Sequence, residues 1–235
     1  PLVVTATFAD GENEVTTAPQ HISLLVTPPG GVSADRGKDH VVVENDFFRL
    51  TCRPKGGLCR IWSKDRQEYD LRLEDEVGPP FAPADLYQRQ FDLGLEQGPG
   101  WAKVTATAKS RNFPGLTLTR EIIVTGSPLV EVRYRVVNNA AAPVTFQVLP
   151  KVRFFDIQKA RVALPRKERL VIERASEFPS TEGDLPQKPA LLAEQWIAFM
   201  RDGQMTGIVW SEDVVEHEMW WERLFLYFAE RTLEP

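Results

Sequence analysis

The residues best suited to proton transfer lie near the C-terminus, in the stretch VVEHEMWW. His217 is flanked there by Glu216 and Glu218, and a nearby carboxylate raises the pKa of an imidazole. In a strand, however, His217 points to the opposite face from both neighbours. The pattern therefore favours a structural or surface histidine, with Glu216 and Glu218 together on the other face.

Glu216 and Glu218 also raise the question of sugar hydrolysis. Alternate positions of a strand are about 7 Å apart, and glycosidases use two carboxyl groups about 5–10 Å apart across the sugar. Solvated carboxylates are nevertheless common in a chain with 33 acidic and 28 basic residues. We therefore predict no catalytic residue, and we keep His217, Glu216 and Glu218 as candidates for binding carbohydrate.

The six tryptophans offer a second kind of carbohydrate site, because the C–H faces of sugars stack on aromatic rings. Trp220 and Trp221 are adjacent, so in a strand they point to opposite faces and one of them leaves the core. Trp101, Trp210 and Trp221 are the candidates for an aromatic platform. Core packing is the alternative for each.

The stretch LVEVRYRVVNN shows strand alternation most clearly. Its valines and Tyr134 share one face, and Glu131, Arg133 and Arg135 share the other. The charged face is either solvated or the floor of a polar groove, and alternation leaves both readings open. Arg133 and Arg135 are included as candidates for hydrogen bonds to a sugar.

Both cysteines lie in TCRPKGGLCRIW. If PKGG is a four-residue turn between two strands, Cys52 faces Cys59, close enough for a disulfide after some local closure. A disulfide and two free thiols both remain open. Two cysteines and three scattered histidines, without HExxH or CxxC spacing, form no metal-ligand set, and no phosphate-binding loop is present. We predict neither a metal nor a cofactor.

About a dozen strand-like runs at short spacing must position these residues, and no window shows a helical period with caps. This pattern predicts an all-β fold, a large antiparallel two-sheet supersandwich. The runs at 2–9 and 21–27 flank a turn-rich segment and predict an additional N-terminal β-hairpin.

The segment VVVENDFFRLTCRPKGGLCRIWSKDRQE resembles the opening of the galactose-mutarotase-like supersandwich. That domain occurs in aldose epimerases and as the β-domain of glycoside hydrolases, α-mannosidases and polysaccharide lyases. LTLTREIIVTGSPLVEVRYRVVNN and QWIAFMRDGQMTGIVWSED resemble later parts of it, so the resemblance covers roughly residues 40–235. The family would imply a histidine acid and a glutamate base, but His21 and His40 lie outside the expected positions. Only His217 is left, so epimerase activity is not expected.

The domain organisation follows from the same resemblance. Residues 1–29 are expected to form the N-terminal hairpin or an immunoglobulin-like remnant, 30–39 a linker, and 40–235 the mutarotase-like β-sandwich. The closing ERTLEP resembles the lead into a final strand, which is either missing or supplied differently. Because the chain begins at Pro1 without an initiator methionine, we interpret it as a piece of a larger protein.

The composition excludes some classes of binding partner. A formal net charge of −5 argues against nucleic acid or an anionic membrane, and no apolar run approaches the ~20 residues of a membrane span. The sequence predicts a non-catalytic carbohydrate-binding or scaffolding domain of a secreted or cell-surface protein, with an oligo- or polysaccharide and other domains of the same chain as partners. The alternatives are an accessory domain of a glycoside hydrolase or lyase whose catalytic residues lie elsewhere, and a structural module of a surface-layer or adhesive protein.

Overall fold

The computed structural model describes residues 2–10, 13–16, 30–64, 70–154, 159–175, 192–201, 204–220 and 222–235. Within these ranges the structure has no helix that is long and apolar enough to cross a lipid bilayer. Its strands are Leu2–Asp10 (β1), Asn13–Thr16 (β2), Ser33–Arg36 (β3), Val41–Glu44 (β4), Phe48–Cys52 (β5), Cys59–Ser63 (β6), Asp70–Gly78 (β7), Asp92–Gly98 (β8), Trp101–Lys109 (β9), Leu116–Thr125 (β10), Val130–Asn138 (β11), Val144–Phe154 (β12), Arg161–Pro165 (β13), Leu170–Arg174 (β14), Trp196–Arg201 (β15), Gln204–Trp210 (β16), Val214–Trp220 (β17), Arg223–Phe228 (β18) and Arg231–Leu233 (β19).

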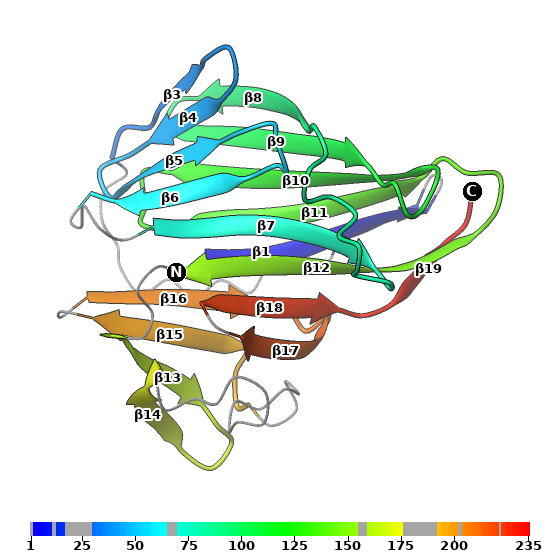
Figure 1. Ribbon diagram of the computed structural model, residues 1–235. Helices are drawn as coiled ribbons and strands as arrows, with labels where there is room; N and C mark the ends of the chain where they lie inside the picture. The colour runs from blue at the N-terminus through cyan, green and yellow to red at the C-terminus, as the bar shows by residue number, and fades with distance from the viewer. Residues whose placement is uncertain are drawn as a thin grey trace.

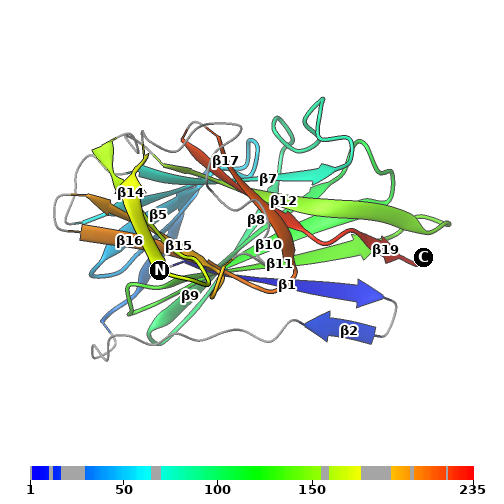
Figure 2. The ribbon, with the colours of Figure 1, turned by 90° about the horizontal axis from the view of Figure 1, so that it is seen from below.

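The strands form two sheets that face each other as the layers of a sandwich (Figure 1, Figure 2). The ten-stranded sheet has the order β14-β13-β15-β16-β1-β11-β10-β9-β8, with β2 beside β1. The nine-stranded sheet has the order β17-β18-β12-β7-β6-β5-β4-β3, with β19 beside β12. Apart from β1, which is described below, the paired strands run antiparallel. The predicted all-β, two-sheet sandwich is therefore confirmed.

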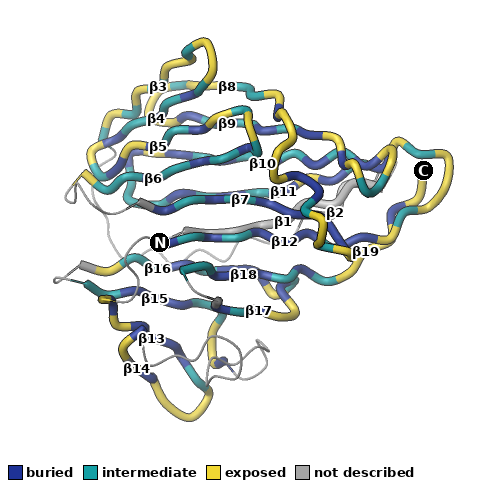
Figure 3. Tube along the Cα trace, in the orientation of Figure 1, coloured by how far each residue is buried: buried dark blue, intermediate teal, exposed yellow. Residues whose placement is uncertain are grey.

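Alternation along the strands builds the core between the two sheets. In β10 every second residue from Leu116 to Val124 is buried, and the residues between them are half-buried. Figure 3 shows the same alternation of buried and less buried positions along most strands of both sheets. The alternating strands therefore have an inner face, turned toward the other sheet, and an outer face, turned away from it.

β1 lies within the ten-stranded sheet rather than beside it. Its residues Leu2–Phe8 pair parallel with Val130–Val136 of β11, and Leu2–Val4 pair parallel with Ile208–Trp210 of β16. β2 returns antiparallel along β1. The predicted N-terminal hairpin is thus present, but its second strand is Asn13–Thr16. The strand predicted at 21–27 lies outside the described residues.

Two further segments are more regular than the sequence indicated. Ser33–Arg36, in the predicted linker 30–39, pairs antiparallel with β4. Arg231–Leu233, in the closing ERTLEP, pairs antiparallel with Val144–Phe146 of β12. Both segments therefore add strands to the nine-stranded sheet, while the division into domains at 29 and 39 stays a prediction.

Candidate functional site

The residues predicted to bind carbohydrate lie in separate parts of the sandwich. Trp101, Arg133 and Arg135 are on the outer face of the ten-stranded sheet. Arg133 Nε donates a hydrogen bond to Glu131 Oε1 at 2.8 Å. Trp101 is 38% exposed. Arg133 lines up across β10 with Thr105 of β9. Trp101 lies four residues before Thr105 on the same strand, a distance of about 13 Å. These three side chains therefore do not form one compact site.

Trp210, a candidate for the aromatic platform, and His217, a separate candidate for binding carbohydrate, both lie in the core, where neither ring offers a surface to a sugar. Trp210 is 1% exposed and His217 is 0% exposed, with their ring centroids 5.3 Å apart. Neither ring nitrogen of His217 has a hydrogen-bond partner among the described residues. Burial lowers the pKa of His217 from 6.5 to about 4, so the ring is neutral at physiological pH.

Glu216 and Glu218 point to the outer face of the nine-stranded sheet, as alternation with His217 predicts. The Tyr227 hydroxyl donates to Glu218 Oε2 at 3.2 Å. Burial first, and then the Glu218 charge, raise the pKa of Tyr227 to about 12. Phe81 packs edge-on against Tyr227, with ring centroids 5.9 Å apart. Trp221, the third aromatic candidate, lies outside the described residues.

A concave site that was not predicted lies on the outer face of β4, β5 and β6. It is a shallow hollow of about 580 Å³. Its lining combines one aromatic ring, several basic side chains and a few hydroxyl and apolar groups. The lining residues are His40, Val42, Glu44, Arg49, Thr51, Arg53, Trp62, Ser63 and Lys64. We call this site the Trp62 hollow.

The register of three strands builds the floor of the Trp62 hollow. Glu44 of β4 faces Arg49 of β5, and Arg49 faces Trp62 of β6. The inner face of the same strands carries residues such as Leu50 and Ile61, which are buried against the other sheet. Because successive side chains of a strand point to opposite faces, burial of the apolar set turns the polar set and Trp62 outward.

Positive charge dominates the Trp62 hollow. Lys64 Nζ lies 2.8 Å from Glu44 Oε1, and this contact lowers the pKa of Glu44 below its usual value. Arg49 and Arg53 are exposed. Arg49 faces Glu44 across the strands and, after Lys64, its charge also lowers the pKa of Glu44. After the contact with His40, the charge of Arg53 lowers the pKa of Asp39. The hollow thus presents two exposed guanidinium groups, each with five N–H donors.

An indole ring beside guanidinium groups suits a polar ligand with apolar faces. A sugar stacks its C–H face on the ring, and its oxygens accept hydrogen bonds from the arginines. Thr51 and Ser63 add hydroxyl groups that both donate and accept. Over the described part of the chain, no three potential metal ligands of the types His, Cys, Asp and Glu come together.

One sequence signal pointed to the Trp62 hollow. In CRIWSK, Cys59 and Ile61 share one face of the strand, so Trp62 must leave the core with Arg60 and Lys64. An outward tryptophan between basic residues is uncommon on a solvated face. The cross-strand arrangement with Arg49 could not be derived from that stretch alone.

The hairpin between β5 and β6 has the register that the PKGG turn predicts. Arg53 N donates to Leu58 O at 2.8 Å, and Cys52 faces Cys59. The structure joins the two cysteines in a disulfide, and both are fully buried.

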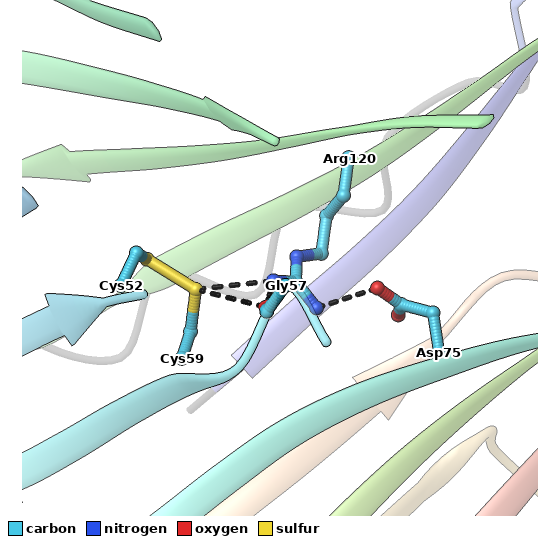
Figure 4. The surroundings of a disulfide bond; sticks show 5 residues. All are labelled: Cys52, Gly57, Cys59, Asp75 and Arg120. Carbon is cyan, nitrogen blue, oxygen red and sulfur yellow. Dashed lines mark hydrogen bonds and ion pairs between the residues drawn. A yellow bond between two sulfur atoms is a disulfide. The ribbon is translucent and has the colours of Figure 1, made fainter. Parts of the chain in front are cut away.

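A buried ion pair lies against this disulfide (Figure 4). Arg120 and Asp75 are both inaccessible to solvent, with Nη1 and Oδ2 2.6 Å apart. Arg120 Nη2 donates to Gly57 O and contacts Cys59 Sγ at 3.0 Å. Tyr134 donates to the other oxygen of Asp75 at 2.6 Å. The cluster ties the turn between β5 and β6 to both sheets.

The chain matches none of the protein-family models and none of the curated proteins with which it was compared. The site must therefore be interpreted from its own geometry.

Proposed function

We propose that this chain is a non-catalytic carbohydrate-binding or scaffolding domain of a larger secreted or cell-surface protein, built as a mutarotase-like supersandwich. The sugar binds in the Trp62 hollow, with one face on the indole ring. Arg49 and Arg53 donate hydrogen bonds to its oxygens. The observation that carries the proposal is the position of Trp62 beside these two arginines in a concave surface.

Two further features support this proposal. Glycoside hydrolysis uses two carboxyl groups across the sugar, whereas the hollow has one carboxylate, Glu44, which is held by Lys64. Glu216 and Glu218 are on β17, which is separated from β6 by β7, β12 and β18. The disulfide between Cys52 and Cys59 is typical of proteins from oxidising compartments such as the cell exterior.

A glycan array with three proteins tests the proposal. The wild-type chain is expected to bind at least one glycan, and Trp62→Ala is expected to weaken that binding about tenfold or more, because a buried aromatic contact is lost. Trp62→Phe should keep part of the affinity. Trp101→Ala is the matched control, because it removes an exposed tryptophan from the opposite sheet.

Two results would contradict the proposal. In the first, Trp101→Ala weakens glycan binding and Trp62→Ala binds the glycan as tightly as the wild type. The other is a wild-type chain that binds no glycan on the array. Near-ultraviolet circular dichroism of each variant checks that the sandwich is folded before its binding is compared.

A further inference from the structure

A row of four arginines crosses the outer face of the nine-stranded sheet. Arg60 of β6 faces Arg72 of β7, Arg72 faces Arg153 of β12, and Arg153 faces Arg223 of β18. Neighbouring strands are about 4.8 Å apart, so the row is about 14 Å long. We call these residues the arginine row.

The arginine row continues directly from the Trp62 hollow. Thr51, which lines the hollow, faces Arg60 across β5 and β6. Trp62 is two residues from Arg60 on the same strand and points to the same face. Hollow and row therefore form one continuous surface, from the indole ring across β7 and β12 to β18.

The charge of this surface is opposite to that of the whole chain. The chain has a formal net charge of −5, yet Arg49, Arg53 and the arginine row lie together on one face. Three successive strand pairs place these arginines side by side, and such a row gives an anionic ligand several guanidinium groups to bind at once.

Acidic residues near the arginine row bind part of its N–H donors. Arg153 binds Glu222 through Nε and Nη2 at 3.2 and 3.0 Å, and Lys151 lies 3.3 Å from Glu76. Arg223 has no acidic partner among the described residues. Because a guanidinium group has five N–H donors in a planar fork, it can bind one carboxylate and still donate to a second anion.

We propose that the ligand of this surface is an acidic polysaccharide whose carboxylate or sulfate groups bind the arginine row while one sugar stacks on Trp62. This inference rests on the proposed carbohydrate-binding function and specifies its ligand class. Planar bidentate pairing with guanidinium suits both carboxylate and sulfate groups. A row of several strand spacings suits a polymer with repeated charges rather than one small anion.

The test compares polymers that share a backbone and differ in charge. Polygalacturonate is compared with its methyl ester, heparin with desulfated heparin, and poly-L-glutamate serves as a polyanion without sugar. Calorimetry with the wild-type chain is expected to show binding to at least one acidic polysaccharide and about tenfold weaker binding to its uncharged counterpart. Added salt should weaken that binding, because it screens exposed charges.

Variants locate the charge-dependent binding. Arg72→Gln and Arg223→Gln are each expected to weaken binding of the acidic polymer about tenfold. Arg135→Gln removes an exposed arginine from the opposite sheet and is expected to leave the affinity within about twofold. Two variants are used so that misfolding of one does not decide the result.

Several outcomes would overturn the inference. If charged and uncharged polymers bind equally and binding needs Trp62, the carbohydrate site stands and the acidic ligand is wrong. Equal affinity of Arg72→Gln, Arg223→Gln and Arg135→Gln would remove the arginine row from the site. Equally tight binding of poly-L-glutamate would show a general polyanion site. Failure to bind any polymer, acidic or neutral, would reject both proposals.

Discussion

His217 is an ionisable residue in the core, and it makes the stability of the sandwich depend on pH. Burial lowers its pKa from 6.5 to about 4. As the pH falls through this window, the unfolded chain takes up a proton that the folded protein does not. The free energy of unfolding therefore decreases as the pH falls from about 7 toward 4, and well above pH 6.5 His217 contributes no pH dependence.

Replacing His217 by Leu should remove this dependence, because leucine fills a similar volume without titrating. Between pH 7 and pH 5 the wild type is expected to lose about 2 kcal/mol more stability than His217→Leu, measured by urea unfolding. His40→Gln is the control, because it removes a partly exposed histidine and leaves the core unchanged. A wild-type slope in His217→Leu would contradict a buried neutral imidazole.

The sequence could predict which residues share a face, but it could not always identify which faces are covered. Alternation correctly placed Glu216 and Glu218 opposite His217. For Trp62, the neighbours Cys59 and Ile61 indicate locally that the ring points outward. For Trp210, the packing of the two sheets decides that the ring is inside, because burial there depends on residues far away in the chain.

Among the elements, the turn between β5 and β6 has strict backbone requirements. Gly57 has a φ of +58°, and a Cβ atom there would lie 2.8 Å from the ring of Phe91, which is buried. Gly100 has a φ of +76° with open space around it, and Gly31 has open space and no positive φ. A side chain would meet neither backbone strain nor steric overlap at Gly31, strain alone at Gly100, and both at Gly57.

Alanine at each of these positions should therefore lower stability in a fixed order. Gly31→Ala is expected to change the free energy of unfolding by less than about 0.5 kcal/mol. Gly100→Ala should cost about 1–2 kcal/mol, because a side chain is strained at positive φ, and Gly57→Ala should cost more, since overlap with Phe91 is added. Denaturant unfolding measures all three. A cost for Gly57→Ala no greater than that for Gly31→Ala would reject this account of the turn.

The same hairpin shows how far local sequence specifies an element. PKGG predicted the turn and the register of Cys52 with Cys59, because turn length fixes the pairing of the strands that follow. Two contacts of Arg120 could not be predicted: the one with Asp75 and the one with the disulfide. Arg120 lies on β10, far in sequence from Asp75 and from the hairpin, and the packing of the two sheets brings them together.

For the whole molecule, the least predictable feature is the position of β1. Its parallel pairing joins Leu2 to Val130 and to Ile208. No local pattern signals such a long-range neighbour, since alternation marks a strand without naming its partner. β1 bridges the two parts of the ten-stranded sheet, so it should be important for stability.

Proline substitutions test this position of β1. Thr5→Pro in β1 removes a backbone donor at the position that pairs with Arg133 of β11, inside a strand that joins the two parts of the sheet, and should lower stability by at least about 2 kcal/mol. Glu14→Pro in β2 is the control, because β2 is an edge strand and edge strands tolerate proline better. Thermal unfolding compares the two variants. Equal midpoints for Thr5→Pro and the wild type would show that β1 does not hold the sheet together.

The central claim is that carbohydrate binds on the outer face of the nine-stranded sheet. Amide hydrogen exchange tests it most directly, with the chain free and saturated with the glycan that binds most tightly on the array. Bound sugar should slow exchange in residues 41–64, because ligand contacts suppress local opening of β4, β5 and β6. Exchange in residues 101–138 of the opposite sheet should stay unchanged. Protection confined to residues 101–138 would contradict the claim.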